Sequence, residues 1–335
     1  ATHLMSSISK LRLPPRDYNF EGNRRRAGVE IEFAAVSPSR VATRVAKLYG
    51  GTAEQEDPHR FHIRGTRLGN FLVELDTQYA HRAPGEVGPS GSGLQGLMET
   101  FSNTMRELYG DLGSLVIPYE VVCPPIDIEQ LPELEALLLA LREEGAQGTR
   151  DNLLHAFGVQ FNPDIATRDP QWILAVLKAE ILLSEWLRSI ISVDMARRIL
   201  AFADPFPKAY IHIILKDEYW PDIDQLIEDY LIYNPTRNRE LDMLPLFLWL
   251  DADRVRRKIP DKLVKPRPTF HYRLPDANIR ESRWSLTLEW NRWCVVERLA
   301  EDREILAEMG KSYLENDLSI LSEDWALRCT EWLVL

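Results

Sequence analysis

Acidic side chains inside a predicted strand are the first feature of this sequence that could do chemistry. Glu30 and Glu32 alternate with apolar residues in the segment 27–35. Such period-two alternation predicts a half-buried strand with both glutamates on one face. Strands disfavour glutamate, and like charges that share a sheet face repel one another. A divalent cation would neutralise them, so this strand is a candidate metal site.

Two further segments repeat the pattern. Glu74 and Asp76 share one face of a strand predicted over 70–77, and Glu120 lies in a third strand, 115–123. Hard oxygen ligands favour Mg²⁺, with Mn²⁺ as an alternative, and Mg²⁺ also takes phosphate oxygens as ligands. The alternative is that each acidic strand is the solvated face of an antiparallel sheet. Three such strands together favour the metal site.

Amide, imidazole and guanidinium groups follow in later strands. Gln160 and Asn162 alternate in a fourth predicted strand, 155–162. The last predicted strand carries His271 and Arg273 on one face. A neutral imidazole can ligate a metal, whereas a guanidinium fork binds phosphate or carboxylate.

Two more arginines stand in a proline-bounded segment, 234–247. Arg237 and Arg239 flank an asparagine there. Both could bind a nucleotide phosphate. Equally, both could belong to a solvated loop and pair with Glu240 and Asp242, so the two interpretations stay open.

The elements that would position these groups indicate an α+β fold. No glycine-rich phosphate loop follows a strand, and the regular alternation of a doubly wound sheet is missing. We expect a mainly antiparallel curved sheet packed on helices, with carboxylates lining its open face. A short strand is also predicted at 209–215. The predicted helices cover 37–50, 95–109, 131–145, 168–202 and 279–328. The expected organisation is an irregular lead-in (1–26), a catalytic domain (27–278) and a helical C-terminal extension packed on it (279–335).

Composition limits the partners. The 335 residues carry a formal charge of −11, which argues against nucleic acid and against an anionic membrane surface. Three scattered cysteines do not make a disulfide framework or a zinc site. There is no apolar run long enough to span a bilayer, and residues 1–15 lack the apolar stretch of a signal peptide. We therefore expect a cytoplasmic protein.

The strands also resemble a known family. The segment Gly28–Phe33 matches the Gly-x-Glu-x-Glu-Phe strand of the carboxylate–amine ligases, the group that contains glutamine synthetase and glutamate–cysteine ligase. Within that group the chain is most similar to the amidoligase family, whose motifs it follows in order. The matching segments after the first are 71–76, 119–125, 234–247 and 270–276.

This resemblance implies a glutamine-synthetase-like catalytic domain in which Mg²⁺ ions bridge the phosphates of ATP. Glu32 and Glu120 would hold the cation nearest the substrate, helped by Asp76 or Glu74. Glu30 would hold the cation nearest the nucleotide.

Two positions depart from the family pattern. Gln160 stands where a histidine is usual, and His271 stands where a metal-binding glutamate is usual. Arg273 keeps the expected basic position. The two departures leave open whether the nucleotide-side cation binds.

The implied reaction has two steps: a carboxylate attacks the γ-phosphate of ATP, and an amine then displaces phosphate from the acyl phosphate. Glu32, Glu120 and Arg273 would be catalytic, and the nucleotide would also contact Gln160, Asn162, Arg237 and Arg239. The substrates would be small-molecule or peptide carboxylates and amines, with a partner glutaminase as one source of ammonia. A metal-dependent phosphotransferase or hydrolase, and a non-catalytic binding relative, are the alternatives. The oligomeric state, including a homo-oligomer, stays open.

Overall fold

A single antiparallel sheet organises the chain in the computed structural model, which describes residues 10–34, 36–76, 119–146, 155–191, 203–275 and 284–334. Within these residues nine strands follow the order β2-β3-β4-β5-β1-β7-β9-β8, and β6 pairs with β1. The strands are β1 (Arg26–Ala34), β2 (Thr52–Asp57), β3 (Arg60–Thr66), β4 (Gly69–Leu75), β5 (Tyr119–Val122), β6 (Ile126–Asp127), β7 (His155–Pro163), β8 (Leu241–Asp242) and β9 (His271–Tyr272).

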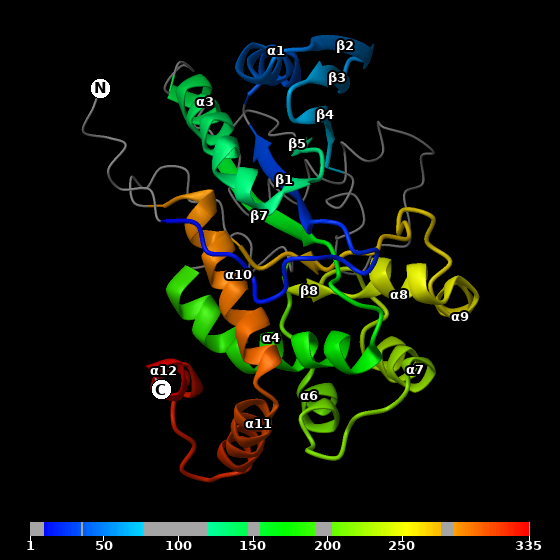
Figure 1. Ribbon diagram of the computed structural model, residues 1–335, viewed down its shortest axis with the longest axis vertical. Helices are drawn as coiled ribbons and strands as arrows, with labels where there is room; N and C mark the ends of the chain where they lie inside the picture. The colour runs from blue at the N-terminus through cyan, green and yellow to red at the C-terminus, as the bar shows by residue number, and fades with distance from the viewer. Residues whose placement is uncertain are drawn as a thin grey trace, which may run out of the picture.

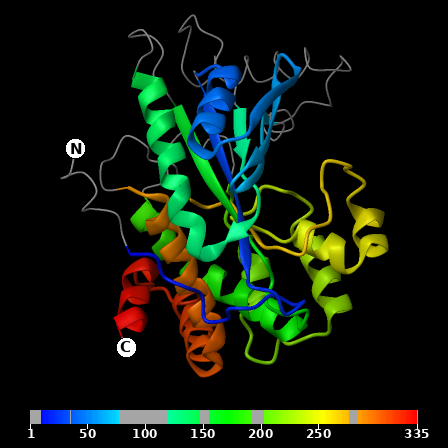
Figure 2. The ribbon, with the colours of Figure 1, turned by 45° about the horizontal axis from the view of Figure 1, so that its top comes forward.

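Helices flank the central strands of this sheet on two sides. Both ribbon views place α3 and α10 to the left of β1 and β7, with α8 and α9 to the right (Figures 1 and 2). The helical elements are α1 (Pro38–Tyr49), η3 (Ile128–Leu134), α3 (Glu135–Ala146), α4 (Pro170–Ile191), α6 (Lys208–Ile214), α7 (Ile223–Tyr233), α8 (Leu244–Leu250), α9 (Ala252–Lys258), α10 (Leu286–Glu301), α11 (Arg303–Asp317) and α12 (Trp325–Val334).

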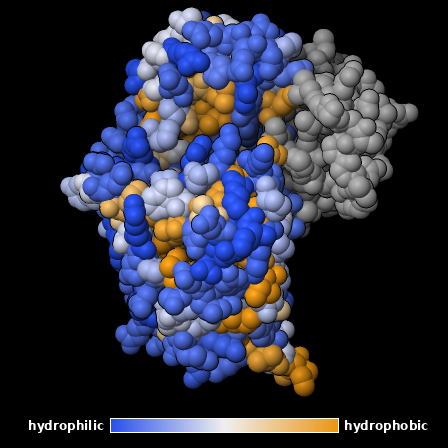
Figure 3. Space-filling model, turned by 90° about the vertical axis from the view of Figure 1, so that its right-hand side faces the viewer, coloured by the Kyte–Doolittle hydropathy of each residue, from blue (hydrophilic) through white to orange (hydrophobic). Residues whose placement is uncertain are grey.

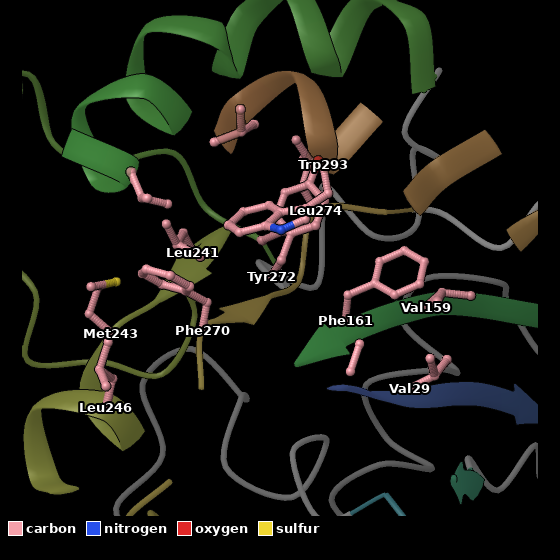
Figure 4. Packing of buried hydrophobic residues seen from close by; sticks show 14 of the residues in the cluster. Val29, Val159, Phe161, Leu241, Met243, Leu246, Phe270, Tyr272, Leu274 and Trp293 are labelled. Carbon is pink, nitrogen blue, oxygen red and sulfur yellow. The ribbon is translucent and has the colours of Figure 1, made fainter. Parts of the chain in front are cut away.

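Alternation in the sequence decides which sheet face is buried. In β1, Val29, Ile31 and Phe33 are 0–1% exposed and belong to the core, whereas Glu30 between them is only half-buried. Figure 4 shows Val29 of β1 and Val159 and Phe161 of β7 directed to the same packed layer. The expected α+β fold with an antiparallel sheet packed on helices is therefore confirmed.

Aromatic side chains join the apolar face to the helices. Phe161 of β7 meets Trp290 of α10 with ring centroids 5.5 Å apart. Tyr272 of β9 lies 5.0 Å from Trp293, one turn further along α10 (Figure 4). Because each aromatic ring buries a large apolar area, these contacts fix α10 against β7 and β9.

Local predictions failed in several places. The helix predicted over 279–328 is divided, in the described residues, among α10, α11 and α12. The segment 209–215 is helix α6 rather than a strand, because burial of Tyr210 and Ile214 at i, i+4 spacing outweighs the strand preference of its isoleucines. The last strand predicted from the sequence, expected to carry both His271 and Arg273, is only two residues long in the structure, as β9. The helix predicted over 95–109 lies outside the described residues.

The face shown in Figure 3 is covered mainly by hydrophilic residues, with separate hydrophobic patches. Among the described helices, none combines the length and apolar character that crossing a bilayer requires.

Candidate functional site

Three glutamates stand side by side across neighbouring strands. Glu120 of β5 is paired directly with Glu32 of β1 on one side and with Glu74 of β4 on the other. Side chains at directly paired positions lie on the same sheet face, with Cβ atoms about 5 Å apart. Glu32 is buried, and Glu74 also accepts hydrogen bonds from Arg60, at 3.0 Å from its Nε. We call Glu74, Glu120 and Glu32 the carboxylate row.

The carboxylates of the row lie close enough to affect the ionisation of Glu120. Burial raises the pKa of Glu120 well above its usual range, and the charges of Asp76, Glu30, Glu74 and Glu32 raise it further. Asp76 comes two residues after Glu74, at the end of β4, and is itself buried. A group of carboxylates that repel one another in this way is stabilised by a cation.

Glu30 forms the next row together with polar side chains of β7 and β9. It is paired with Gln160, and Asn162 donates from Nδ2 to its Oε1 over 3.1 Å. Gln160 in turn donates from Nε2 to Asn162 Oδ1 over 2.7 Å. Burial raises the pKa of Glu30, while the charge of Arg273 and the hydrogen bond from Asn162 act in the opposite direction.

Arg273 supplies a positive charge at this end of the face. Its side chain is only 5% exposed; Nη1 donates to Gln160 Oε1 and Nη2 donates to Asp242 Oδ2 over 3.1 Å. Burial on its own lowers the pKa of this guanidinium, but the neighbouring carboxylates, Asp242 first and then Glu30, raise it above its ordinary value. The face therefore places a fixed cation beside the carboxylates.

Asp242 was not among the residues selected from the sequence. It is fully buried in β8, where it is paired with His271 of β9. A signal for it existed, because residues 240–242 repeat the Glu-Leu-Asp sequence found at 74–76. The two-residue strand was too short for the alternation to be read.

His271 is also buried in this part of the face. Burial lowers its pKa well below the usual value, and the charges of Arg273 and Arg237 lower it further. The imidazole is therefore neutral near pH 7, and Thr269 Oγ1 lies 3.5 Å from its Nδ1. A neutral imidazole has a lone pair with which it can ligate a metal.

The two loop arginines differ in their surroundings. Arg239 is held by Asn234 Oδ1, 2.8 Å from its Nε, and by the carbonyl oxygens of Pro205 and Tyr233 at 3.3 Å. Its guanidinium thus fixes the loop after α7. Arg237 is half-buried, and its charge lowers the pKa of both Glu30 and His271. Of the pair, Arg237 is the one placed near the other candidate residues.

The carboxylate and imidazole groups of this face fit an Mg²⁺ ion that is also bound by phosphate oxygens of a substrate. Within the described residues, no three Asp, Glu, His or Cys side chains converge closely enough to hold a metal by themselves. Mg²⁺ needs less than that, since it is usually bound by one or two carboxylates, waters and substrate phosphates. A small surface pocket lies elsewhere, between the N-terminal segment, β6 and η3, and is lined by none of the candidate residues.

Comparison with known protein families identifies the family of the chain. Residues 23–295 match a family model described as "Putative amidoligase enzyme". The matched range spans β1 to α10 and so includes every candidate residue named above. No curated protein and no solved structure gives a significant match to the chain.

Proposed function

Because the chain belongs to the amidoligase family, we propose that it is an ATP- and Mg²⁺-dependent ligase that joins a carboxylate to an amine on a glutamine-synthetase-like catalytic sheet. The observation that carries this proposal is the carboxylate row, three directly paired glutamates beside the buried guanidinium of Arg273. A solvated sheet face gives no reason to bury such charges.

The carboxylate row, with Asp76, is where Mg²⁺ would bind. Glu30 and His271 are the candidate ligands for a second cation on the nucleotide side. When bound, the cations would neutralise the phosphate oxygens of ATP and of the transferred phosphoryl group. The raised pKa of Glu120 is consistent with this assignment, because burial and the charges of four neighbouring carboxylates both disfavour its ionised form.

Arg273 and Arg237 would act on the phosphate side. Phosphoryl transfer is catalysed mainly by positioning and by fixed charges that stabilise the transferring group. Arg273 is held by two hydrogen bonds, so its charge does not need to reorganise during the reaction. Arg237 would complete the contact to phosphate from the loop after α7.

The second step would use the same face. An amine would displace phosphate from the acyl phosphate, and a carboxylate of the row would accept the proton that the amine loses. The amine would be a small molecule, a peptide, or ammonia supplied by a partner glutaminase.

A thermal-shift titration with Mg²⁺ and ATP tests this function. The wild type is compared with Glu32→Gln in the carboxylate row and with Glu54→Gln, a matched change in the exposed strand β2. A ligand at about 100 times its dissociation constant adds about 2.7 kcal/mol of stability. We expect this shift in the wild type and the control, and its loss in Glu32→Gln.

Product analysis then identifies the reaction. A ligase gives continuous turnover, with ADP, phosphate and an amide as products, only when both a carboxylate and an amine are present; the carboxylate alone gives about one ADP per active site as the acyl phosphate forms. A hydrolase or phosphotransferase turns over without the amine. No shift with any nucleotide would refute the ligase proposal.

A further inference from the structure

An unbroken chain of hydrogen-bonded side chains crosses the face from β8 to β1. Arg273 joins Asp242 to Gln160, Gln160 donates to Asn162, and Asn162 donates to Glu30. We propose that Asp242 is a positioning residue, which acts through Arg273 to orient Glu30. In the same proposal, Gln160 and Asn162 form a bridge, and Gln160 is not a cation ligand. This inference rests on the proposed function, because the site that is oriented is the one assigned there.

The direction of every hydrogen bond in the chain is fixed by its two ends. The guanidinium of Arg273 can only donate, so Gln160 must turn its oxygen toward it. The amide nitrogen of Gln160 then faces Asn162 Oδ1, 2.7 Å away, and Asn162 Nδ2 faces the carboxylate of Glu30. The oxygen of Gln160, which is the atom that could ligate a metal, thereby gives one of its two lone pairs to Arg273, whose positive charge also disfavours a cation at this atom.

Asp242 is held on both of its carboxylate oxygens, so it can fix the orientation of Arg273. Its Oδ1 accepts from the backbone nitrogen of Leu244 over 3.0 Å, at the start of α8, and its Oδ2 accepts from Arg273. Because the side chain is fully buried, no solvent competes for either oxygen. The backbone nitrogen of Arg273 also donates to Glu240 O over 2.7 Å, so β8 fixes both ends of the arginine.

The variant Asp242→Asn separates the positioning role from the role in folding. An asparagine keeps Oδ1 as the acceptor for Leu244 but turns an amide donor toward the donors of Arg273. We expect the arginine to lose its anchor and the bridge to lose its fixed direction. Loss of a group that orients a metal ligand costs about 10–100-fold in metal affinity or activity. We expect kcat and the affinity for Mn²⁺ both to fall by up to that factor, because Glu30 is a candidate ligand of the cation.

The decisive measurement is made without nucleotide. Side-chain amide signals of Gln160 and Asn162 are recorded by ¹⁵N NMR and assigned from their loss in Gln160→Ala and Asn162→Ala. Asp242→Asn should move both pairs of signals. The matched control is Glu240→Gln, a buried acid two residues away whose carboxylate binds Arg188 Nε at 3.0 Å instead, and it should leave them in place.

Each outcome decides one point. Unmoved amide signals in Asp242→Asn overturn the positioning role, whatever the enzyme does with ATP. If Gln160→Ala weakens Mn²⁺ binding by about tenfold or more beyond the effect of Asp242→Asn, which disturbs the same bridge, Gln160 is a ligand and the bridge is refuted. Absence of MgATP binding in the wild type counts against the proposed function alone. If Asp242→Asn does not fold, Gln160→Glu replaces it as the test variant. This change keeps the acceptor for Arg273 but removes the donor to Asn162, so the bridge requires that the Asn162 signals move.

Discussion

Replacing Glu120 by glutamine removes the central charge of the carboxylate row. The wild-type carboxyl is flanked by Glu32 and Glu74 at directly paired positions. For charges about 5.5 Å apart, each repulsion costs about 0.8 kcal/mol in water and about 3 kcal/mol at an effective dielectric constant of 20. Relief of two such repulsions predicts that Glu120→Gln is about 1.5–6 kcal/mol more stable than the wild type without metal at pH 8.

The pH dependence of this difference follows from the direction of the shift. Folding raises the pKa of Glu120, so the folded state binds its proton more tightly than the unfolded state. The stability that this proton provides is fully present below the unfolded pKa of about 4.5 and is lost as pH rises through the folded pKa. Glu120→Gln has no proton to lose there. The two proteins should therefore have similar stability at pH 4 and differ most at pH 8.

Urea unfolding at pH 4 and pH 8, with EDTA and with Mg²⁺, measures this difference. Added Mg²⁺ and ATP should reverse the order of stability at pH 8, since only the wild type retains the complete row that we propose binds the cation. Glu129→Gln is the control, because its exposed pair with Arg24 should contribute less than about 1 kcal/mol. A wild type that is more stable than Glu120→Gln in EDTA at pH 8 would refute the reasoning.

Two further predictions concern buried charges outside the site. In the wild type, the guanidinium of Arg25 donates to the buried Glu297 over 2.6 and 2.8 Å. Arg25→Ala leaves that carboxylate buried without its partner and should lower the free energy of unfolding, measured in urea, by about 3–5 kcal/mol. Arg16→Ala, which removes an exposed ion pair, is the control. Glu180 of α4 is fully buried, and neither of its carboxyl oxygens has a hydrogen-bond partner in the part of the chain that the structure describes. Burial raises its pKa, so its ionisation opposes folding as pH rises above the unfolded value. Glu180→Gln should therefore raise the melting temperature at pH 8 more than at pH 5, and an equal effect at both pH values would contradict this assignment.

The sequence alone determined the chemistry of the face. Alternation in β1 and β4 separates acidic from apolar positions, because successive side chains of any strand point to opposite sides. That rule is local, so it places Glu30 and Glu32 on the face opposite the apolar residues of their strand, and Glu74 likewise in its own strand, before any partner strand is known. The α+β class follows in the same way from helical and alternating segments.

Only the tertiary structure decided which of these groups meet. The pairing of Glu32 with Glu120 and of Glu120 with Glu74 depends on strand register, and a shift by one residue would send each side chain to the other face. The contact between Asp242 and Arg273 joins two strands that are too short to show alternation. Helix α6 was decided by packing rather than by local preference. Register and packing are long-range properties. For this reason the sequence identified the carboxylates but not the bridge of Gln160 and Asn162 that orients Glu30.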